Sequence, residues 1–228
     1  MRSLVLILAA AAAYGQSPAK LTGFPFQDET LHYKIRWTDG LLLGDAVFSA
    51  RKAPNGWTLE TSIEAGIPGF AIKDIYRSSA TAELCSTEFE RKYNHRGKQT
   101  AEQTTFDAPL RRAVRRTTQP PSDGKSEFTI PACPHDAVTF VYFMRREMGQ
   151  GRVAPAETVY FGSRYSVSLK YIGEVKAGSA ISDRLVGTVK GPNSSFSLEI
   201  DFARDAARTP LAIRAPLAVG MLSAELVR

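Results

Sequence analysis

The side chains that most often carry chemistry are few and dispersed in this chain. Its three histidines, His32, His95 and His135, have no second histidine or cysteine at the spacing of a metal site. Neither a G-x-S-x-G nucleophile turn nor a glycine-rich phosphate loop occurs. We therefore expect no catalytic residue, no metal ion and no cofactor, and we interpret the chain as non-enzymatic. The alternative is a hydrolase of cell-envelope polymers without a recognisable motif, which would need His95 or His135 beside carboxylates.

The basic residues include one local cluster. The 228 residues contain 29 Lys and Arg against 23 Asp and Glu, which gives a formal net charge of +6. Four arginines lie close together, namely Arg111, Arg112, Arg115 and Arg116. Such a segment is typical of a solvated edge strand, where charge discourages pairing with another chain. The alternative is an anion or partner patch, through which the protein would bind another envelope protein. No aromatic residues are interleaved with these arginines, so we expect no nucleic-acid partner.

The chain has two cysteines, Cys85 and Cys133. Their spacing excludes a C-x-x-C redox pair. In an oxidising compartment the two can form a disulfide, which we predict. Two free buried thiols are the alternative.

The first residues have the parts of a secretory signal peptide. Arg2 is followed by an unbroken apolar run from Leu4 to Ala13, and the small residues Ala13 and Gly15 form an A-x-G cleavage site. This run is shorter than the ~20 apolar residues that span a membrane. We predict a signal peptide over residues 1–15, cleaved near Gly15-Gln16. The remaining residues, 16–228, are expected to form a single β-rich domain that is periplasmic or secreted and does not span a membrane.

Alternating side chains predict β-strands along most of this domain. In residues 31–37 the apolar positions recur with period two, at Leu31, Tyr33, Ile35 and Trp37. Gly44 inside the next strand indicates a bulge or a close backbone approach. Because turn signals recur throughout, we predict a mainly β fold with a single strongly curved antiparallel sheet of about twelve strands. This sheet would form an open or partly closed barrel.

One segment, residues 136–148, has the pattern of an α-helix. Asp136 is a suitable N-cap and Gly149 a suitable terminator. The segment is apolar on nearly all sides, so we expect this helix to be buried against the concave face of the sheet.

Several short motifs occur in a characteristic order. They are Leu31-x-Tyr33-x-Ile35-x-Trp37 followed by Gly44, Tyr76-Arg77-Ser78-Ser79, Cys133-Pro134-His135-Asp136-Ala137 continuing to Tyr142-Phe143-Met144-Arg145, Pro210-Leu211 and Val219-Gly220. In this order, from about Leu31 to Leu226, they resemble the bacterial exported family called domain of unknown function 3108. The resemblance implies a periplasmic or secreted, largely antiparallel β protein. That family has no established activity, so the resemblance implies no site residue.

A strongly curved sheet can enclose more space than its own side chains fill. We therefore predict an exported envelope protein that binds a lipid or another apolar ligand in the concave face of the sheet. The candidate lining residues are Tyr33, Ile35, Trp37, Trp57, Phe140 and Met144. The alternative is that these side chains only pack the core.

Overall fold

The computed structural model describes residues 27–67, 70–177, 180–217 and 220–227. The predicted signal peptide, residues 1–15, and its cleavage site lie outside the described residues. Within the described part, no helix has both the length and the apolar content needed to cross a membrane.

The described residues form one curved sheet of fifteen strands and a single α-helix. The first eight strands are β1 (Glu29–Arg36), β2 (Leu42–Ala53), β3 (Gly56–Ile67), β4 (Phe70–Ala80), β5 (Ser86–His95), β6 (Lys98–Asp107), β7 (Arg112–Gln119) and β8 (Pro121–Thr129). They are followed by β9 (His135–Asp136), α1 (Ala137–Gly149), β10 (Glu157–Tyr160), β11 (Arg164–Ala177), β12 (Ala180–Lys190), β13 (Ser195–Ala203), β14 (Pro210–Leu217) and β15 (Gly220–Leu226). The prediction of a mainly β fold with one curved sheet is confirmed.

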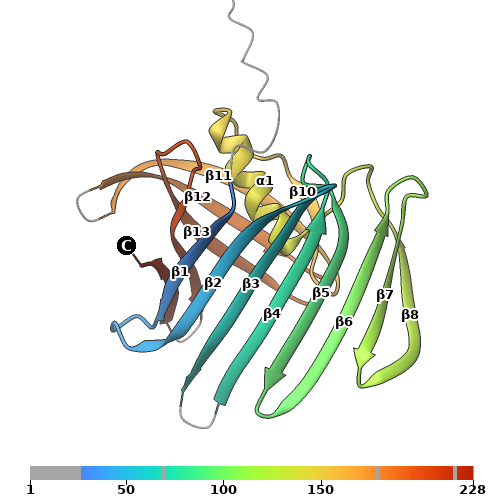
Figure 1. The fold of residues 1–228 in the computed structure, drawn as a ribbon. Coiled ribbons are helices and arrows are strands. Elements are labelled where there is room, and N and C mark those ends of the chain that lie inside the picture. Colours follow the sequence, from blue (N-terminus) through green and yellow to red (C-terminus); the bar gives the residue numbers. More distant parts are fainter. Residues whose placement is uncertain (1–26, 68–69, 178–179, 218–219, 228) are drawn as a thin grey trace, which may run out of the picture.

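The sheet is open, and its two edges are β8 and β9. The chain runs outward from β1 to β8, passes through α1, and returns from β10 to β15, which pairs with β1. Figure 1 shows the helix on the concave side, between the two halves of the sheet. Neighbouring strands are antiparallel except for β9 and β10. The strand number exceeds the predicted twelve, in part because β9 has two residues and cannot show a period-two pattern.

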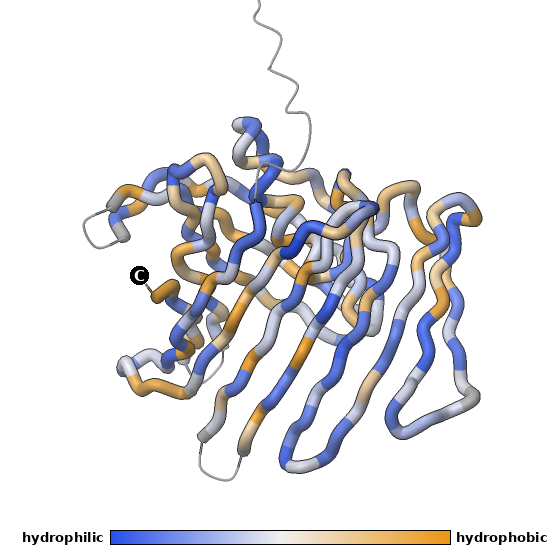
Figure 2. The backbone as a smooth tube through the Cα atoms, viewed as in Figure 1, coloured by the Kyte–Doolittle hydropathy of each residue, from blue (hydrophilic) through white to orange (hydrophobic). Residues whose placement is uncertain are grey.

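The predicted alternation of apolar and polar residues determines which side chains lie on the buried face of the sheet and which lie on the exposed face. Tyr33 and Ile35 of β1 are buried, whereas His32 between Leu31 and Tyr33 is exposed. Figure 2 shows the same alternation of hydrophobic and hydrophilic positions along many strands. The predicted close approach at Gly44 is confirmed, because a Cβ there would lie 2.0 Å from the carbonyl oxygen of Glu64.

The helix lies where the sequence predicts it. Asp136 is the N-cap, and its side chain accepts hydrogen bonds from the backbone N–H groups of Val138 and Thr139. The helix ends beyond the predicted terminator, because Gly149 is still helical. Gly151 (φ +72°) instead adopts the left-handed conformation, and the Gly151 and Arg152 N–H groups bond back to the Met148 and Glu147 carbonyls. This is the pattern of a Schellman motif.

Buried polar contacts fix the helix to the sheet. The Ser78 and Ser86 hydroxyls each donate to the Asp136 carboxylate at 2.7 Å. Near the other end of the helix, the Arg145 guanidinium binds both carboxylate oxygens of Glu29 in β1 and is 1% exposed.

The predicted disulfide is confirmed. Cys85 and Cys133 are bonded, with their Cα atoms 4.7 Å apart. The bond joins the loop between β4 and β5 to the segment that leads into the helix. Next to it, the Ser86 N–H donates to the carbonyl of Pro134 at 2.8 Å. The N-terminal end of α1 is therefore held by covalent and hydrogen-bonded contacts together.

Candidate ligand-binding site

The concave face contains a large apolar groove between β1–β4 and β14–β15. We call it the sheet groove, and its volume is about 700 Å³. Among the described residues that line it, only Asp74 and Ser223 carry a carboxylate or hydroxyl group. The lining residues are Ile35, Trp37, Leu41, Leu43, Ala46, Phe48, Ile63, Ala65, Gly66, Ile72, Asp74, Ile213, Ala215, Leu222, Ser223 and Ala224.

The groove exists because small side chains occupy several inward-facing positions. Ala46, Ala65, Ala215 and Ala224 each contribute a single methyl group to the wall. Methyl groups on strands that face one another across a curved sheet leave space that larger side chains would fill. The small inward-facing residues therefore make this part of the concave face apolar but leave the groove unfilled.

A second apolar cavity lies between α1 and β10–β14, and we call it the helix cavity. Its volume is about 370 Å³. The lining residues are Ala137, Phe140, Val141, Met144, Val159, Phe161, Tyr165, Val167, Leu169, Gly187, Val189, Phe196, Leu198, Ile200 and Ile213. Ile213 of β14 lines both spaces, so the helix cavity adjoins the sheet groove.

The structure separates the six predicted lining residues into three groups. Ile35 and Trp37 line the sheet groove, and Phe140 and Met144 line the helix cavity. The other two, Tyr33 and Trp57, are buried and line neither space.

Tyr33 and Trp57 have structural surroundings. The Tyr33 hydroxyl donates to the carbonyl of Pro210 at 2.8 Å, which ties β1 to β14. Burial raises the pKa of Tyr33 above its usual range. Trp57 packs in the main core together with Leu59 and Leu84.

At the polar end of the sheet groove His95 lies beside a carboxylate, as the hydrolase alternative requires, although the sequence analysis did not name Asp74 or Tyr76. Asp74 accepts a 2.7 Å hydrogen bond from the Tyr76 hydroxyl and lies 3.0 Å from Nε2 of His95. Burial, together with the hydrogen bond to Asp74, raises the pKa of Tyr76 above its usual range. Period-two alternation could have indicated this cluster, because it places Asp74 and Tyr76 on the same face of β4 as the apolar Ile72.

The other two histidines lie apart from this cluster. His135 is buried next to the helix, where Nδ1 lies 2.6 Å from Glu157 and the ring stacks on Phe143 with centroids 4.3 Å apart. His32 is exposed on the outer face of β1. In the described part of the chain, no group of three or more His, Cys, Asp or Glu side chains is placed to hold a metal ion.

The arginine segment does not form the predicted edge strand. Arg112–Gln119 is β7, which is covered by β8, and β8 is the actual edge. The charge that led to the edge prediction does not prevent pairing, because Arg112, Arg115 and Arg116 lie in register with Thr129, Ser126 and Lys125 of β8.

The four arginines also do not form one patch. Arg111 lies in the turn before β7 with φ +52°. Arg112 and Arg116 are exposed and lie on the face opposite Ala113, which is fully buried in the core. Arg115 shares the inner face with Ala113 and lines a pocket there.

A solved structure has a similar fold. It is titled as the crystal structure of a beta-barrel-like protein of domain of unknown function DUF1849 from Brucella abortus. The match has a TM-score of 0.66 and covers 89% of this chain and 97% of that chain, at 7% sequence identity. At this identity the likeness shows the fold alone.

The sequence comparisons agree with the motif order described above. No match was found among curated proteins. The model of one family, described as protein of unknown function (DUF3108), matches residues 32–227. Because this match spans nearly all the described residues, the chain belongs to the DUF3108 family.

Proposed function

We propose that this protein is exported to the periplasm or secreted, where it binds a lipid or another ligand with an aliphatic chain, without catalysing a reaction. The observation that carries this proposal is the sheet groove, an apolar space of about 700 Å³ on the concave face. Ligand sites in proteins commonly measure ~300–1,000 Å³ and are lined mostly by apolar side chains with a few polar groups. The sheet groove has both properties.

Core packing alone is a weaker explanation of this surface. Leu41, at the entrance between β1 and β2, is 55% exposed, and Trp37 beside it is only partly buried. An apolar surface open to water is costly, and a bound chain would gain about 0.8 kcal/mol for each methylene removed from water. A ligand with an aliphatic chain therefore fits the groove better than water does.

Two observations favour the exported location. The N-terminal segment has the pattern of a signal peptide, and Cys85 and Cys133 are bonded. Structural disulfides persist in oxidising compartments and are rare in the cytosol.

The test combines native mass spectrometry with a variant that fills the groove. The native spectrum of protein purified gently from the cell envelope should contain a bound apolar molecule. Ala215→Phe places a ring inside the groove, so the affinity for a neutral apolar dye such as N-phenyl-1-naphthylamine should fall at least tenfold. Val47→Phe is the matched control, because Val47 lies on the outer face of β2. Equal dye binding by both variants, with no molecule in the native spectrum, would contradict the proposal.

A further inference from the structure

The geometry points to an anionic amphiphile as the ligand of the helix cavity. Its chain would lie in that cavity, and its carboxylate, phosphate or sulfate head group would lie in an adjoining basic pocket. This inference rests on the proposed function. It adds the helix cavity, which adjoins the sheet groove at Ile213, as the place of the chain, and it specifies the class of ligand.

The basic pocket lies between β7–β8 and the ends of β11 and β12, and its volume is about 560 Å³. Arg115, Arg164 and Lys190 line it, together with the hydroxyl groups of Ser126 and Ser166. In strand register Lys190 lies opposite Ser166, so these two side chains share one face of β11–β12. No acidic side chain is among the described residues that line the pocket.

These three cations differ from most arginines of the sheet in lacking a carboxylate partner. Arg77, Arg91 and Arg184, for example, bind Glu60, Glu102 and Asp201.

Among the described residues, by contrast, none of Arg115, Arg164 and Lys190 has an ion-pair partner. Arg115 donates a 3.4 Å hydrogen bond to the Ser126 hydroxyl. Like charges that converge on one pocket repel one another, so a bound anion would relieve an unfavourable arrangement.

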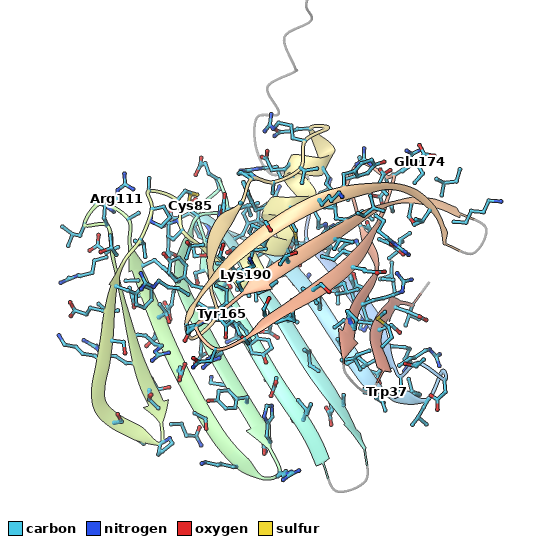
Figure 3. All side chains as sticks on the ribbon, turned by 180° about the vertical axis from the view of Figure 1, so that it is seen from behind. Trp37, Cys85, Arg111, Tyr165, Glu174 and Lys190 are labelled. Carbon is cyan, nitrogen blue, oxygen red and sulfur yellow. A yellow bond between two sulfur atoms is a disulfide. The ribbon has the colours of Figure 1, made fainter. Side chains whose placement is uncertain are left out.

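Tyr165 connects the basic pocket with the helix cavity. It lines both spaces, whereas its neighbours separate by face, with Val167 toward the cavity and Ser166 toward the pocket. Figure 3 shows Tyr165 and Lys190 close together where the ends of β11 and β12 meet. A Cβ at Gly191 would lie 2.5 Å from the Tyr165 ring, so this ring lies directly on the β12–β13 turn. Tyr165 is therefore the residue at which the cavity and the basic pocket meet, and in our inference the ligand passes from one space to the other beside its ring.

The experiment compares ligands that share one chain and differ in the head group. Dodecanoate, dodecyl phosphate and neutral glycerol monododecanoate are titrated against the whole exported protein below their micelle concentrations, with inorganic phosphate as a fourth ligand. We expect the two anionic amphiphiles to bind about tenfold more tightly than the neutral ester at low salt, the effect of one strong charged contact. This ratio should shrink as the salt concentration rises.

Charge-reversal variants then test whether the basic pocket causes the preference for anionic ligands. Arg164→Glu/Lys190→Glu should bring the ratio between anionic and neutral ligands to about one or below. Arg112→Glu/Arg116→Glu makes the same change in net charge on the opposite face of β7, and it should leave the ratio unchanged. All four substituted side chains are exposed, so both double variants should fold.

The possible outcomes separate this inference from the proposed function. Failure of every dodecyl ligand to bind, the neutral ester included, would contradict the proposed function. Equal affinity for neutral and anionic ligands, or a ratio that falls equally in both double variants, would overturn only the head-group assignment. Inorganic phosphate that binds as tightly as dodecyl phosphate would assign the pocket to a free anion and would overturn the amphiphile.

Discussion

The two spaces on the concave face have similar apolar linings, but a helix covers only one of them. The helix cavity lies under α1, which is fixed by the Asp136 cap, the Arg145 ion pair and the nearby disulfide. The sheet groove has no helix over it, and ion pairs on its strands, such as Lys34 with Asp45, are exposed. The comparison indicates that buried polar contacts hold the helix over one space, while small side chains leave the other space open.

The polar groups at the two ends also differ in sign. The sheet groove ends at a carboxylate, Asp74, which is already bonded to Tyr76 and lies beside His95. The helix cavity adjoins three cations that lack carboxylate partners among the described residues. If the inferred anionic ligand binds, it should therefore prefer the helix cavity, which adjoins the cations at Tyr165, to the sheet groove, which ends at a carboxylate.

The largest expected effect comes from breaking the buried ion pair of the helix side. Arg145→Ala leaves the Glu29 carboxylate without its main partner in a largely buried place, which typically costs about 3–5 kcal/mol. Urea unfolding should show a loss of this size. The matched control is Arg36→Ala, because Arg36 pairs with Glu225 at the surface and should contribute at most about 1 kcal/mol. Similar losses of stability in both variants would contradict the stronger contribution of the buried pair.

An intermediate effect concerns acid stability in β13, whose Leu198 and Ile200 line the helix cavity and whose Asp201 lies on the opposite face. Asp201 of β13 is 1% exposed and binds Arg184 at 2.7 Å and Arg214 at 2.6 Å. Burial opposes its ionisation, but the two arginines prevail and lower the pKa of its carboxyl. Stability from this group is therefore present above the unfolded pKa of about 4 and is lost as the pH falls through the lower folded value.

Asp201→Asn tests this directly. The variant should lose about 2 kcal/mol near pH 7 and should show a shallower fall in the free energy of unfolding below about pH 4 than the parent protein. Denaturant unfolding as a function of pH measures both quantities. Asp45→Asn, in an exposed pair, should leave the acid slope unchanged. An unaltered slope in Asp201→Asn would show that the charge of Asp201 does not stabilise this strand at neutral pH.

The smallest expected effect is spectroscopic. Trp37 lines the sheet groove, whereas Trp57 is buried in the main core. An aliphatic ligand in the groove should shift the fluorescence of Trp37 to shorter wavelength, because the indole becomes shielded from water. Trp57→Phe should retain the shift and Trp37→Phe should lose it. A shift that follows Trp57 instead would place the ligand away from the groove.

Period-two alternation predicted most of the strands, and Asp136 predicted the start of the helix correctly. These signals are local, since strand faces and N-caps depend on residues a few positions apart. The assignments that failed depended on distant neighbours. Period two places Arg112 and Arg115 on opposite faces of β7, but only the pairing of β7 with β8 places them away from an edge. Asp74 was missed for the same reason, because its partner His95 belongs to the next strand.

By itself the sequence determined the β-rich fold, the single helix and the family, and it predicted the disulfide that the structure shows. Each of these depends on residue type and spacing along the chain. Only the tertiary structure decided that Tyr33 and Trp57 pack the core while Ile35 and Trp37 line open space, and that Arg115, Arg164 and Lys190 meet beside Tyr165. The physical reason is the curvature of the sheet, which brings strands far apart in the chain face to face. Whether opposed side chains touch or leave a cavity depends on both surfaces at once.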